Sequence, residues 1–349
     1  MEQDVRSDVA QFRQLRKGYA GQDRLSVDNV TLGVQQGELF GFLGNNGAGK
    51  STLVKLLTSL IISPTEGKVT IMGIDVDENV SESRKSLGYC MQLNNLFPNL
   101  FPNLTVEEHL KIFAMIHGHN DVQQMVTIIC TNLQLDKYPF IRSSMLSGGN
   151  KRKLMACITL LGNPKLIVLD EPSTRMDPVA QRFLWNTLQH IHTRNTCSII
   201  LVSHSFPEIE ALCDRVAIIC EGKLRCIGTW HHLSDKFGKF YSVQLAFSDS
   251  FHDIVIHQFM PLLQRIYGQC VCLAQVRNDQ YVEIRISKNA PGVSVPHILR
   301  AIHQFSVQFK VKFASIGVST PILSDVFSSW IQKVNKEGKK ALSTNTIYN

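Results

Sequence analysis

The stretch LFGFLGNNGAGKST, residues 39–52, decides the fold of this chain. Its first five residues, Leu39–Leu43, are an apolar run that predicts a buried strand, and a helical pattern follows the glycine-rich turn as far as Leu60. The turn matches the pattern G-x-x-x-x-G-K-[ST], in which glycines let backbone N–H groups curl around phosphates at the start of a helix. We therefore predict a polyphosphate site made by Gly44, Asn45, Asn46, Gly47, Ala48, Gly49, Lys50, Ser51 and Thr52.

Two side chains of this turn suit a nucleotide and its metal ion. Lys50 is expected to neutralise charge on the β- and γ-phosphates, and the Ser51 hydroxyl is expected to ligate Mg2+. The alternative, a glycine-rich structural turn, is disfavoured because the flanking strand and helix also fit the motif. ATP and Mg2+ are the predicted ligands.

A second apolar strand, Leu166–Asp170, ends in two acids. Downstream of a phosphate loop, we expect Asp170 to hold the magnesium, directly or through water, and Glu171 to orient and polarise the attacking water. An apolar strand that ends in Asp-Glu is commonplace by itself, so this prediction depends on the loop upstream.

A third motif, Leu146-Ser147-Gly148-Gly149-Asn150, precedes a helical pattern that reaches about Leu161. Alone it would indicate only a helix N-cap, although a serine hydroxyl, glycine amides and a helix N-terminus also form an anion site. The three motifs in this order resemble the ABC ATPase family. The resemblance implies that Ser147, Gly148 and Gly149 reach across a head-to-tail dimer and cap the γ-phosphate held by a second ATP-binding cassette.

Four further positions match the family in order along the chain. The resemblance implies that Tyr19 stacks on adenine and that Gln92 senses magnesium and the attacking water. It also places Asp177 in the D-loop and makes His204, after the strand Ser198–Ser203, the switch histidine that contacts the γ-phosphate. Each is weak evidence alone, because a single Tyr or His is usually structural.

Within the family the chain resembles subfamily A, the eukaryotic full-length lipid exporters, and in particular their second, C-terminal cassette with its regulatory domain. The segments that carry this resemblance are Asn150–Lys153, Gly88–Cys90, Ser203–Ser205, Glu210–Arg215 and Pro321–Phe327. It implies membrane-spanning transporter domains as partners, lipid as the transported molecule, and a place on the cytoplasmic side of a membrane. The isolated chain is expected to be soluble.

The alternation of β-branched runs with helical patterns predicts an α/β P-loop NTPase domain with a mostly parallel sheet over residues 1–237, including a helical subdomain at about 93–162. From residue 238 to 335 the order of elements predicts a ferredoxin-like α+β domain, and residues 336–349 form a polar tail that we expect to be disordered. The expected elements of this domain are strands at 241–246, 271–276, 281–286 and 309–316, and helices at 253–267, 295–305 and 323–334.

The composition of the 349 residues excludes several classes of protein. Hydrophobic residues make up 44% and charged residues 19%, as in a folded chain, and the net charge of +7 is too scattered to support nucleic-acid binding. No apolar run approaches the ~20 residues that span a bilayer, and residues 1–20 lack the apolar block of a signal peptide. The nine cysteines, irregularly spaced, indicate thiols of a reducing compartment.

Three departures from the family pattern bear on activity. Arg175 stands where glycine is usual in the D-loop, and we expect its long cation to slow closure of the dimer. Met91 replaces a proline before Gln92, and the tetrad FPNL, residues 97–100, is repeated at once as Phe101–Leu104 in what we expect to be a lengthened surface loop. We expect this more flexible region to weaken coupling to the membrane domains.

Two alternatives to a transport ATPase remain open at this stage. One is an ATP-binding regulatory cassette that hydrolyses weakly; the presence of both Glu171 and His204 argues against it. The other is a soluble ABC protein outside transport, which usually has two cassettes in one chain or a long coiled-coil insertion. Neither feature is visible in this sequence.

Overall fold

The computed structural model describes residues 8–22, 24–60, 63–91, 100–174, 176–193, 197–238, 240–247, 255–277, 281–290 and 292–319. The chain divides into two compact units, one up to Trp230 and one from His231 onward. Each unit has its own hydrophobic core and is described separately. Among the described helices, none combines the length and apolarity that crossing a bilayer requires.

A six-stranded sheet forms the centre of the first unit, in the order β10-β9-β3-β8-β7-β6. Five strands run parallel, and β10 pairs antiparallel with β9 at one edge. Every residue of β3, β7 and β8 is buried, as expected for parallel strands covered on both faces. The strands are β3 (Leu39–Leu43), β6 (Leu87–Cys90), β7 (Leu166–Asp170), β8 (Ser198–Ser203), β9 (Arg215–Cys220) and β10 (Lys223–Gly228).

A second, antiparallel sheet in the order β2-β1-β4-β5 packs with the first around the main core. Its Phe12 meets Phe42 of β3 edge-on, with ring centroids 6.0 Å apart. Buried residues of α1 (Lys50–Leu57), the helix that follows the phosphate loop, belong to the same core. The strands are β1 (Asp8–Lys17), β2 (Val27–Gln35), β4 (Glu66–Ile71) and β5 (Ile74–Asp75).

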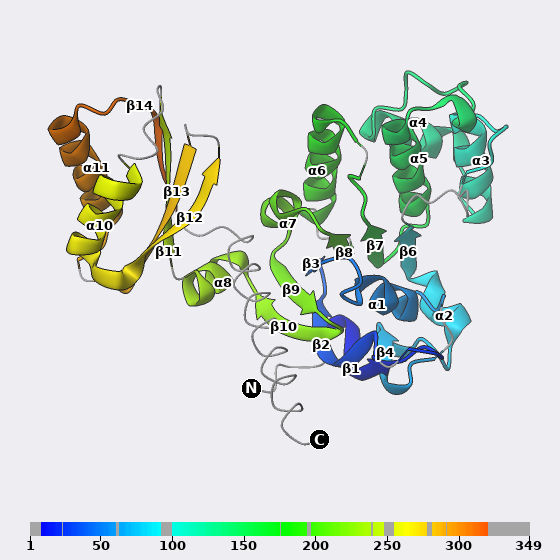
Figure 1. The fold of residues 1–349 in the computed structure, drawn as a ribbon. Coiled ribbons are helices and arrows are strands. Elements are labelled where there is room, and N and C mark those ends of the chain that lie inside the picture. Colours follow the sequence, from blue (N-terminus) through cyan, green and yellow to red (C-terminus); the bar gives the residue numbers. More distant parts are fainter. Residues whose placement is uncertain are drawn as a thin grey trace. The chain divides into compact units, whose positions relative to one another are not determined.

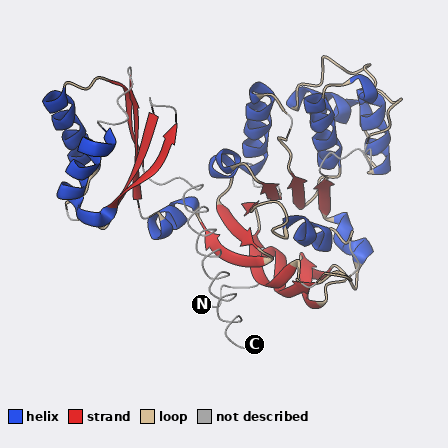
Figure 2. Cartoon of the chain, in the orientation of Figure 1, coloured by secondary structure: helices blue, strands red, loops and turns tan. Residues whose placement is uncertain are grey.

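Helices complete the first unit, and Figures 1 and 2 show α3, α4 and α5 grouped together beyond the β6 end of the parallel sheet. Thr105 and Glu108 form a capping box that fixes the start of α3. The helices are α2 (Val80–Lys85), α3 (Val106–Ile116), α4 (Val122–Asn132), the turn η2 (Ser143–Met145), α5 (Gly148–Leu161), α6 (Pro178–Thr193) and α7 (Phe206–Leu212).

The second unit is a four-stranded antiparallel sheet in the order β12-β13-β11-β14, with α10 and α11 against one face. Numbered along the chain, its strands lie in the order 2-3-1-4, which confirms the predicted ferredoxin-like pattern. The elements are α8 (Trp230–Phe237), β11 (Phe240–Phe247), η3 (Val255–Phe259), α10 (Met260–Tyr267), η4 (Gly268–Cys270), β12 (Val271–Arg277), β13 (Tyr281–Ser287), α11 (Val295–Phe309) and β14 (Phe313–Ser319).

One boundary in this unit was predicted wrongly. The expected strand from Phe309 begins instead at Phe313, because α11 continues past Phe305 by a further turn. The rings of Phe305 and Phe309 pack with centroids 4.8 Å apart, which holds that turn against the core. Lys310 then ends the helix in the left-handed region at φ 53°. The helix expected at 323–334 and the tail 336–349 lie outside the described residues.

Candidate functional site

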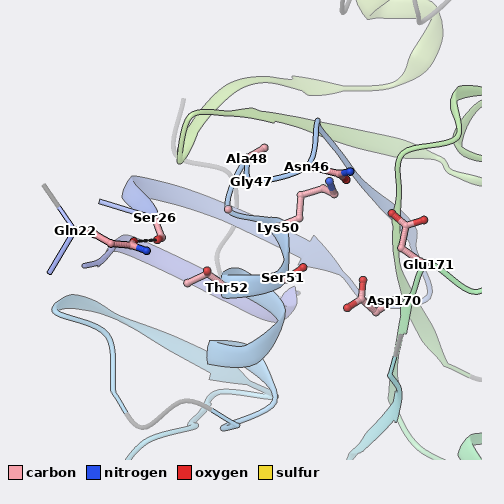
Figure 3. Close-up of a pocket in the computed structure, with 11 residues that line it drawn as sticks. Gln22, Ser26, Asn46, Gly47, Ala48, Lys50, Ser51, Thr52, Asp170 and Glu171 are labelled. Carbon is pink, nitrogen blue, oxygen red and sulfur yellow. Dashed lines mark hydrogen bonds between the residues drawn. The ribbon is translucent and has the colours of Figure 1, made fainter. Parts of the chain in front are cut away.

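A pocket of about 350 Å³ lies where the phosphate loop leaves β3. The carboxyl ends of parallel strands meet at one edge of a sheet, so the end of β7 reaches the same place although it is distant in sequence. Figure 3 shows its two acids on one side of the loop and a pair of polar side chains, Gln22 and Ser26, on the other. The lining residues are Gln22, Ser26, Asn46, Gly47, Ala48, Gly49, Lys50, Ser51, Thr52, Asp170 and Glu171.

Glycine is required where the loop turns into α1. Gly49 has φ +104°, and a Cβ there would lie 2.3 Å from the carbonyl oxygen of Ser26. No side chain fits this position, because the backbone is left-handed and the neighbouring atom belongs to a strand-connecting backbone. The residues at this turn, Gly49 to Thr52, line the pocket.

Lys50 is buried, with 6% of its surface exposed, and its ammonium group is held by the loop itself. The Nζ donates to the carbonyl oxygens of Gly44 at 2.6 Å and Asn45 at 3.1 Å. Burial lowers the pKa of Lys50, and the nearby Glu171 and Asp170 oppose that shift. Gly44 and Asn45 thus serve the site by positioning Lys50 and do not line the pocket.

The two acids at the end of β7 are also buried, Asp170 to 6% exposure and Glu171 to 8%. Burial raises the pKa of Asp170 to about 6, and the neighbouring Glu171 adds to the shift while Arg152 and Lys50 oppose it. Glu171 has a left-handed backbone at φ 52°, which is uncommon for a residue with a Cβ.

The Glu171 carboxylate is oriented by two neighbours. His204, which follows β8, lies with Nδ1 2.7 Å from Glu171 Oε2, and Thr174 donates from Oγ1 to the same oxygen at 3.0 Å. Because a carboxylate oxygen only accepts hydrogen bonds, the proton on His204 lies on Nδ1. The His204 side chain is 61% exposed, so its Nε2 edge is accessible from outside the pocket.

Other predicted residues lie apart from this pocket. Ser147 caps α5 by accepting from the Asn150 amide at 3.3 Å, and neither Ser147, Gly148 nor Gly149 lines the pocket. Asp177 Oδ1 accepts from the amides of residues 179 and 180 at 3.0 and 2.9 Å, so it caps α6.

Tyr19 lies beside the lining without forming part of it. Its hydroxyl is 3.5 Å from Thr52 Oγ1, and its ring is half-buried. Gln92 and Arg175, together with the first copy of the FPNL tetrad up to residue 99, lie outside the described residues.

Comparison with known proteins places this geometry in a family. Residues 27–174 match the ABC transporter family. ATP-binding cassette sub-family A member 2 of Homo sapiens is 34% identical over 337 residues, which are 95% of this chain and 13% of that protein. The retinal-specific phospholipid-transporting ATPase ABCA4 of Bos taurus is 39% identical over 252 residues, which are 72% of this chain and 11% of that protein. The chain contains an ABC transporter cassette.

The fold of the ABC cassette is also found in solved structures. A dimeric ATP-binding cassette bound to ADP and Pi in a post-hydrolysis state matches with a TM-score of 0.57 at 21% identity, over 63% of this chain and 98% of that structure. This confirms the predicted P-loop fold. The chain spans about an eighth of the length of the relatives it matches.

Gln22 and Ser26 line the pocket of the cassette but were not predicted from the sequence. Ser26 Oγ donates to Gln22 Oε1 at 3.4 Å, and the Ser26 amide bonds to the carbonyl of Lys17 at the end of β1. No motif marks either residue, since their place at the pocket depends on how the β1–β2 connection packs against Gly49.

The oxygen atoms at the pocket fit a magnesium ion. Mg2+ prefers oxygen ligands and is usually held by one or two protein groups plus substrate phosphates and water. Ser51 and Asp170 both line the pocket and offer such oxygens. Within the described ranges, no group of three or more His, Cys, Asp or Glu side chains could hold a metal. The remaining ligands would therefore come from the nucleotide and water.

Proposed function

We propose that this cassette binds ATP with Mg2+ and hydrolyses it to ADP and phosphate, paired head-to-tail with a second cassette, to drive transport across a membrane. The observation that carries the proposal is one pocket that joins the phosphate loop with Lys50 to the acids Asp170 and Glu171. The match of residues 27–174 to the ABC transporter family supports the same function.

Binding follows from the loop. Backbone amides at the start of α1 and the helix dipole attract the phosphates, and the Lys50 ammonium exchanges loop carbonyls for phosphate oxygens. Ser51 and Asp170 would hold the magnesium ion, which when bound neutralises phosphate charge as bond cleavage proceeds. We propose that Tyr19, whose hydroxyl lies 3.5 Å from Thr52 Oγ1, stacks on adenine.

Hydrolysis depends on Glu171 and its neighbours. The Glu171 carboxylate orients a water and accepts its proton as the water oxygen bonds to the γ-phosphorus, and the bond from that phosphorus to the β–γ bridging oxygen breaks to leave ADP. His204 Nδ1 lies 2.7 Å from Glu171 Oε2, and we propose that His204 also contacts the γ-phosphate. We propose Gln92 as a further sensor of the metal and the water.

A second cassette completes the site in this proposal. Ser147, Gly148 and Gly149 stand at the exposed start of α5 and do not line the pocket of their own chain. A serine hydroxyl and free amides at a helix start suit a γ-phosphate, so these residues serve the pocket of a partner cassette, with Asp177 nearby in the D-loop. A cassette of the same fold is a dimer bound to ADP and Pi.

Membrane-spanning domains are the second proposed partner. Two segments that hydrogen-bond to each other, 101–107 and 138–145, expose large apolar side chains on the first unit. Large apolar side chains exposed on neighbouring segments suit a protein interaction site. The exposed residues are Phe101, Tyr138, Phe140, Ile141 and Met145. We propose that they dock onto the membrane domains, on the cytoplasmic side of the membrane.

Lipid is the proposed cargo, because one relative is a phospholipid-transporting ATPase with 39% identity over 252 residues. We propose a regulatory role for the ferredoxin-like domain of the second unit, which the sequence predicts over residues 238–335. The 337-residue match to sub-family A member 2 covers 95% of this chain.

The test measures binding and hydrolysis on the full chain. Lys50→Ala is expected to weaken MgATP binding by at least about tenfold, because a buried charge partner for the phosphates is lost. Glu171→Gln is expected to keep MgATP binding, accumulate dimer in light scattering and lose at least about a hundredfold in phosphate release. Lys85→Ala is the control, since this exposed lysine pairs with Glu82 and does not line the pocket.

Other outcomes would point elsewhere. Wild-type phosphate release no faster than that of Glu171→Gln would indicate an ATP-binding regulatory cassette. Undiminished nucleotide affinity in Lys50→Ala would contradict the site itself. Co-purification with ribosomes or DNA, and not with membranes, would favour an ABC protein outside transport.

A further inference from the structure

Arg152 is a fully buried cation in the first turns of α5, with 2% of its surface exposed. Its guanidinium bonds to three backbone carbonyl oxygens on other segments. One terminal nitrogen donates to Met91, and the other donates to Asp170 at 2.7 Å and to Glu171 at 2.6 Å. A charge so deeply buried is costly unless such bonds replace its hydration.

These three carbonyls belong to, or lie next to, residues with proposed roles in hydrolysis. Asp170 and Glu171 are the proposed metal ligand and water activator, and Met91 immediately precedes Gln92. Arg152 itself lies four residues after Gly148, the first residue of α5. One guanidinium therefore connects the helix that serves the partner's pocket to the acids of its own pocket.

The Glu171 backbone is held by hydrogen bonds at both its amide and its carbonyl. Its φ of 52° lies in the left-handed region, which is uncommon for a residue with a Cβ. The Glu171 amide donates to the carbonyl oxygen of Val202 in β8 at 2.9 Å, and the Glu171 carbonyl oxygen accepts a hydrogen bond from Arg152. Loss of the bond from Arg152 would leave the Glu171 carbonyl without this donor, beside a carboxylate that contacts His204.

Simple packing does not account for Arg152. A buried ion is weak evidence for stability, because apolar residues of similar volume often stabilise as well or better. In the described part of the chain, Arg152 Nε has no hydrogen-bond partner, so the guanidinium is not fully satisfied. Its two terminal nitrogens are nevertheless both directed at the site.

We infer that Arg152 is a positioning residue that fixes the backbones of Glu171 and Met91 relative to α5. When Ser147–Gly149 move on binding a partner's nucleotide, Arg152 then transmits that movement to the acids of the pocket in its own chain. This inference rests on the proposed ATPase function. Within the described residues, each hydrogen bond that the Arg152 guanidinium donates goes to a backbone carbonyl outside the phosphate loop. We therefore expect Arg152 to act on turnover through Glu171.

The experiment compares Arg152→Gln and Arg152→Lys in the full chain. We expect MgATP affinity to stay within about threefold of wild type, and kcat to fall at least about tenfold with little change in KM. The kcat of Arg152→Lys should lie between those of wild type and Arg152→Gln, because an ammonium keeps the charge but lacks the planar set of donors of a guanidinium. In the Glu171→Gln background, Arg152→Gln should lower residual turnover no further, as expected for residues that act as a unit.

A second readout needs no turnover. Hydrogen exchange of the nucleotide-free chain should accelerate at least about tenfold in residues 87–91 and 166–174 of Arg152→Gln. Arg215→Gln is the matched control, because Arg215 is a largely buried guanidinium that pairs with Glu38 away from the pocket. It should lower stability without accelerating exchange in those two segments.

The outcomes separate this inference from the proposed function. Wild-type kcat and exchange in both Arg152 variants, or equal losses in Arg215→Gln, would overturn the positioning role. Should Arg152→Gln fail to fold, Arg152→Lys provides the same comparison. If wild type neither binds nor hydrolyses ATP, the proposed function fails, and the exchange measurement still decides whether Arg152 holds the two segments.

Discussion

At the scale of single residues, four charged side chains lie buried at or beside one pocket: Lys50, Arg152, Asp170 and Glu171. The two cations lower the cost of burying the two acids, and both favour the ionised form of Asp170. Burial nevertheless has the larger effect on Asp170 and raises its pKa to about 6. An ionised Asp170 at neutral pH therefore offers a carboxylate to a cation and lowers the stability of the folded chain.

We predict that Asp170→Asn stabilises the nucleotide-free chain at pH 7. The unfolded chain ionises this carboxyl near its ordinary pKa of 3.8 and the folded chain near 6, so the folded chain binds more protons between these values. Its contribution to the free energy of unfolding therefore falls as pH rises through that window. The gain should be about 1–3 kcal/mol at pH 7 in urea unfolding.

The free energies of unfolding of wild type and Asp170→Asn should converge at about pH 4, where folded wild type carries a protonated Asp170. Added MgATP should make wild type more stable than Asp170→Asn at pH 7, because ligand binding stabilises only the protein that can hold the metal, which is wild type. A variant less stable than wild type at pH 7 without nucleotide would contradict the prediction.

At the scale of elements, the second copy of the repeated tetrad is tied to two helices. The Phe101 amide donates to His109 Nε2 of α3 at 2.8 Å, and the Ser143 hydroxyl of η2 donates to the Phe101 carbonyl at 2.7 Å. The Ser143 amide bonds to the Leu104 carbonyl at 2.9 Å. Phe101–Leu104 is thus an ordered support for the start of α3, and not only added length in a surface loop.

Deleting one FPNL copy should leave stability within about 0.5 kcal/mol, because the remaining copy has the same four residues to place against α3 and η2. Thermal unfolding of the full chain measures this. His109→Ala is the comparison, and we expect it to cost about 1–3 kcal/mol, because it removes a fully buried side chain and the acceptor of the Phe101 amide. Equal losses in both variants would show that the length of the repeat itself stabilises the fold.

At the scale of the whole molecule, two separate cores allow independent folding. One core joins the two sheets of the first unit around Phe12 and Phe42, and the other lies between the second sheet and α11 around Phe305. The division at Trp230 coincides with the first residue of α8.

We predict that residues 1–230 alone fold and bind MgATP within about threefold of the full chain, because every residue that lines the pocket belongs to the first unit. Circular dichroism and calorimetric titration check this. A piece that aggregates, or that loses nucleotide affinity by more than about tenfold, would show that the second unit supports the site.

The sequence by itself determined the phosphate loop, the acid-ended strand and the order of elements in the second unit, because each is encoded in a few neighbouring residues. Only the tertiary structure decided that His204 bonds to Glu171, that Gln22 and Ser26 line the pocket, and that Arg152 reaches three carbonyls. These contacts join strands, loops and a helix far apart in the chain. They depend on how β7, β8 and α5 pack, which no local pattern records.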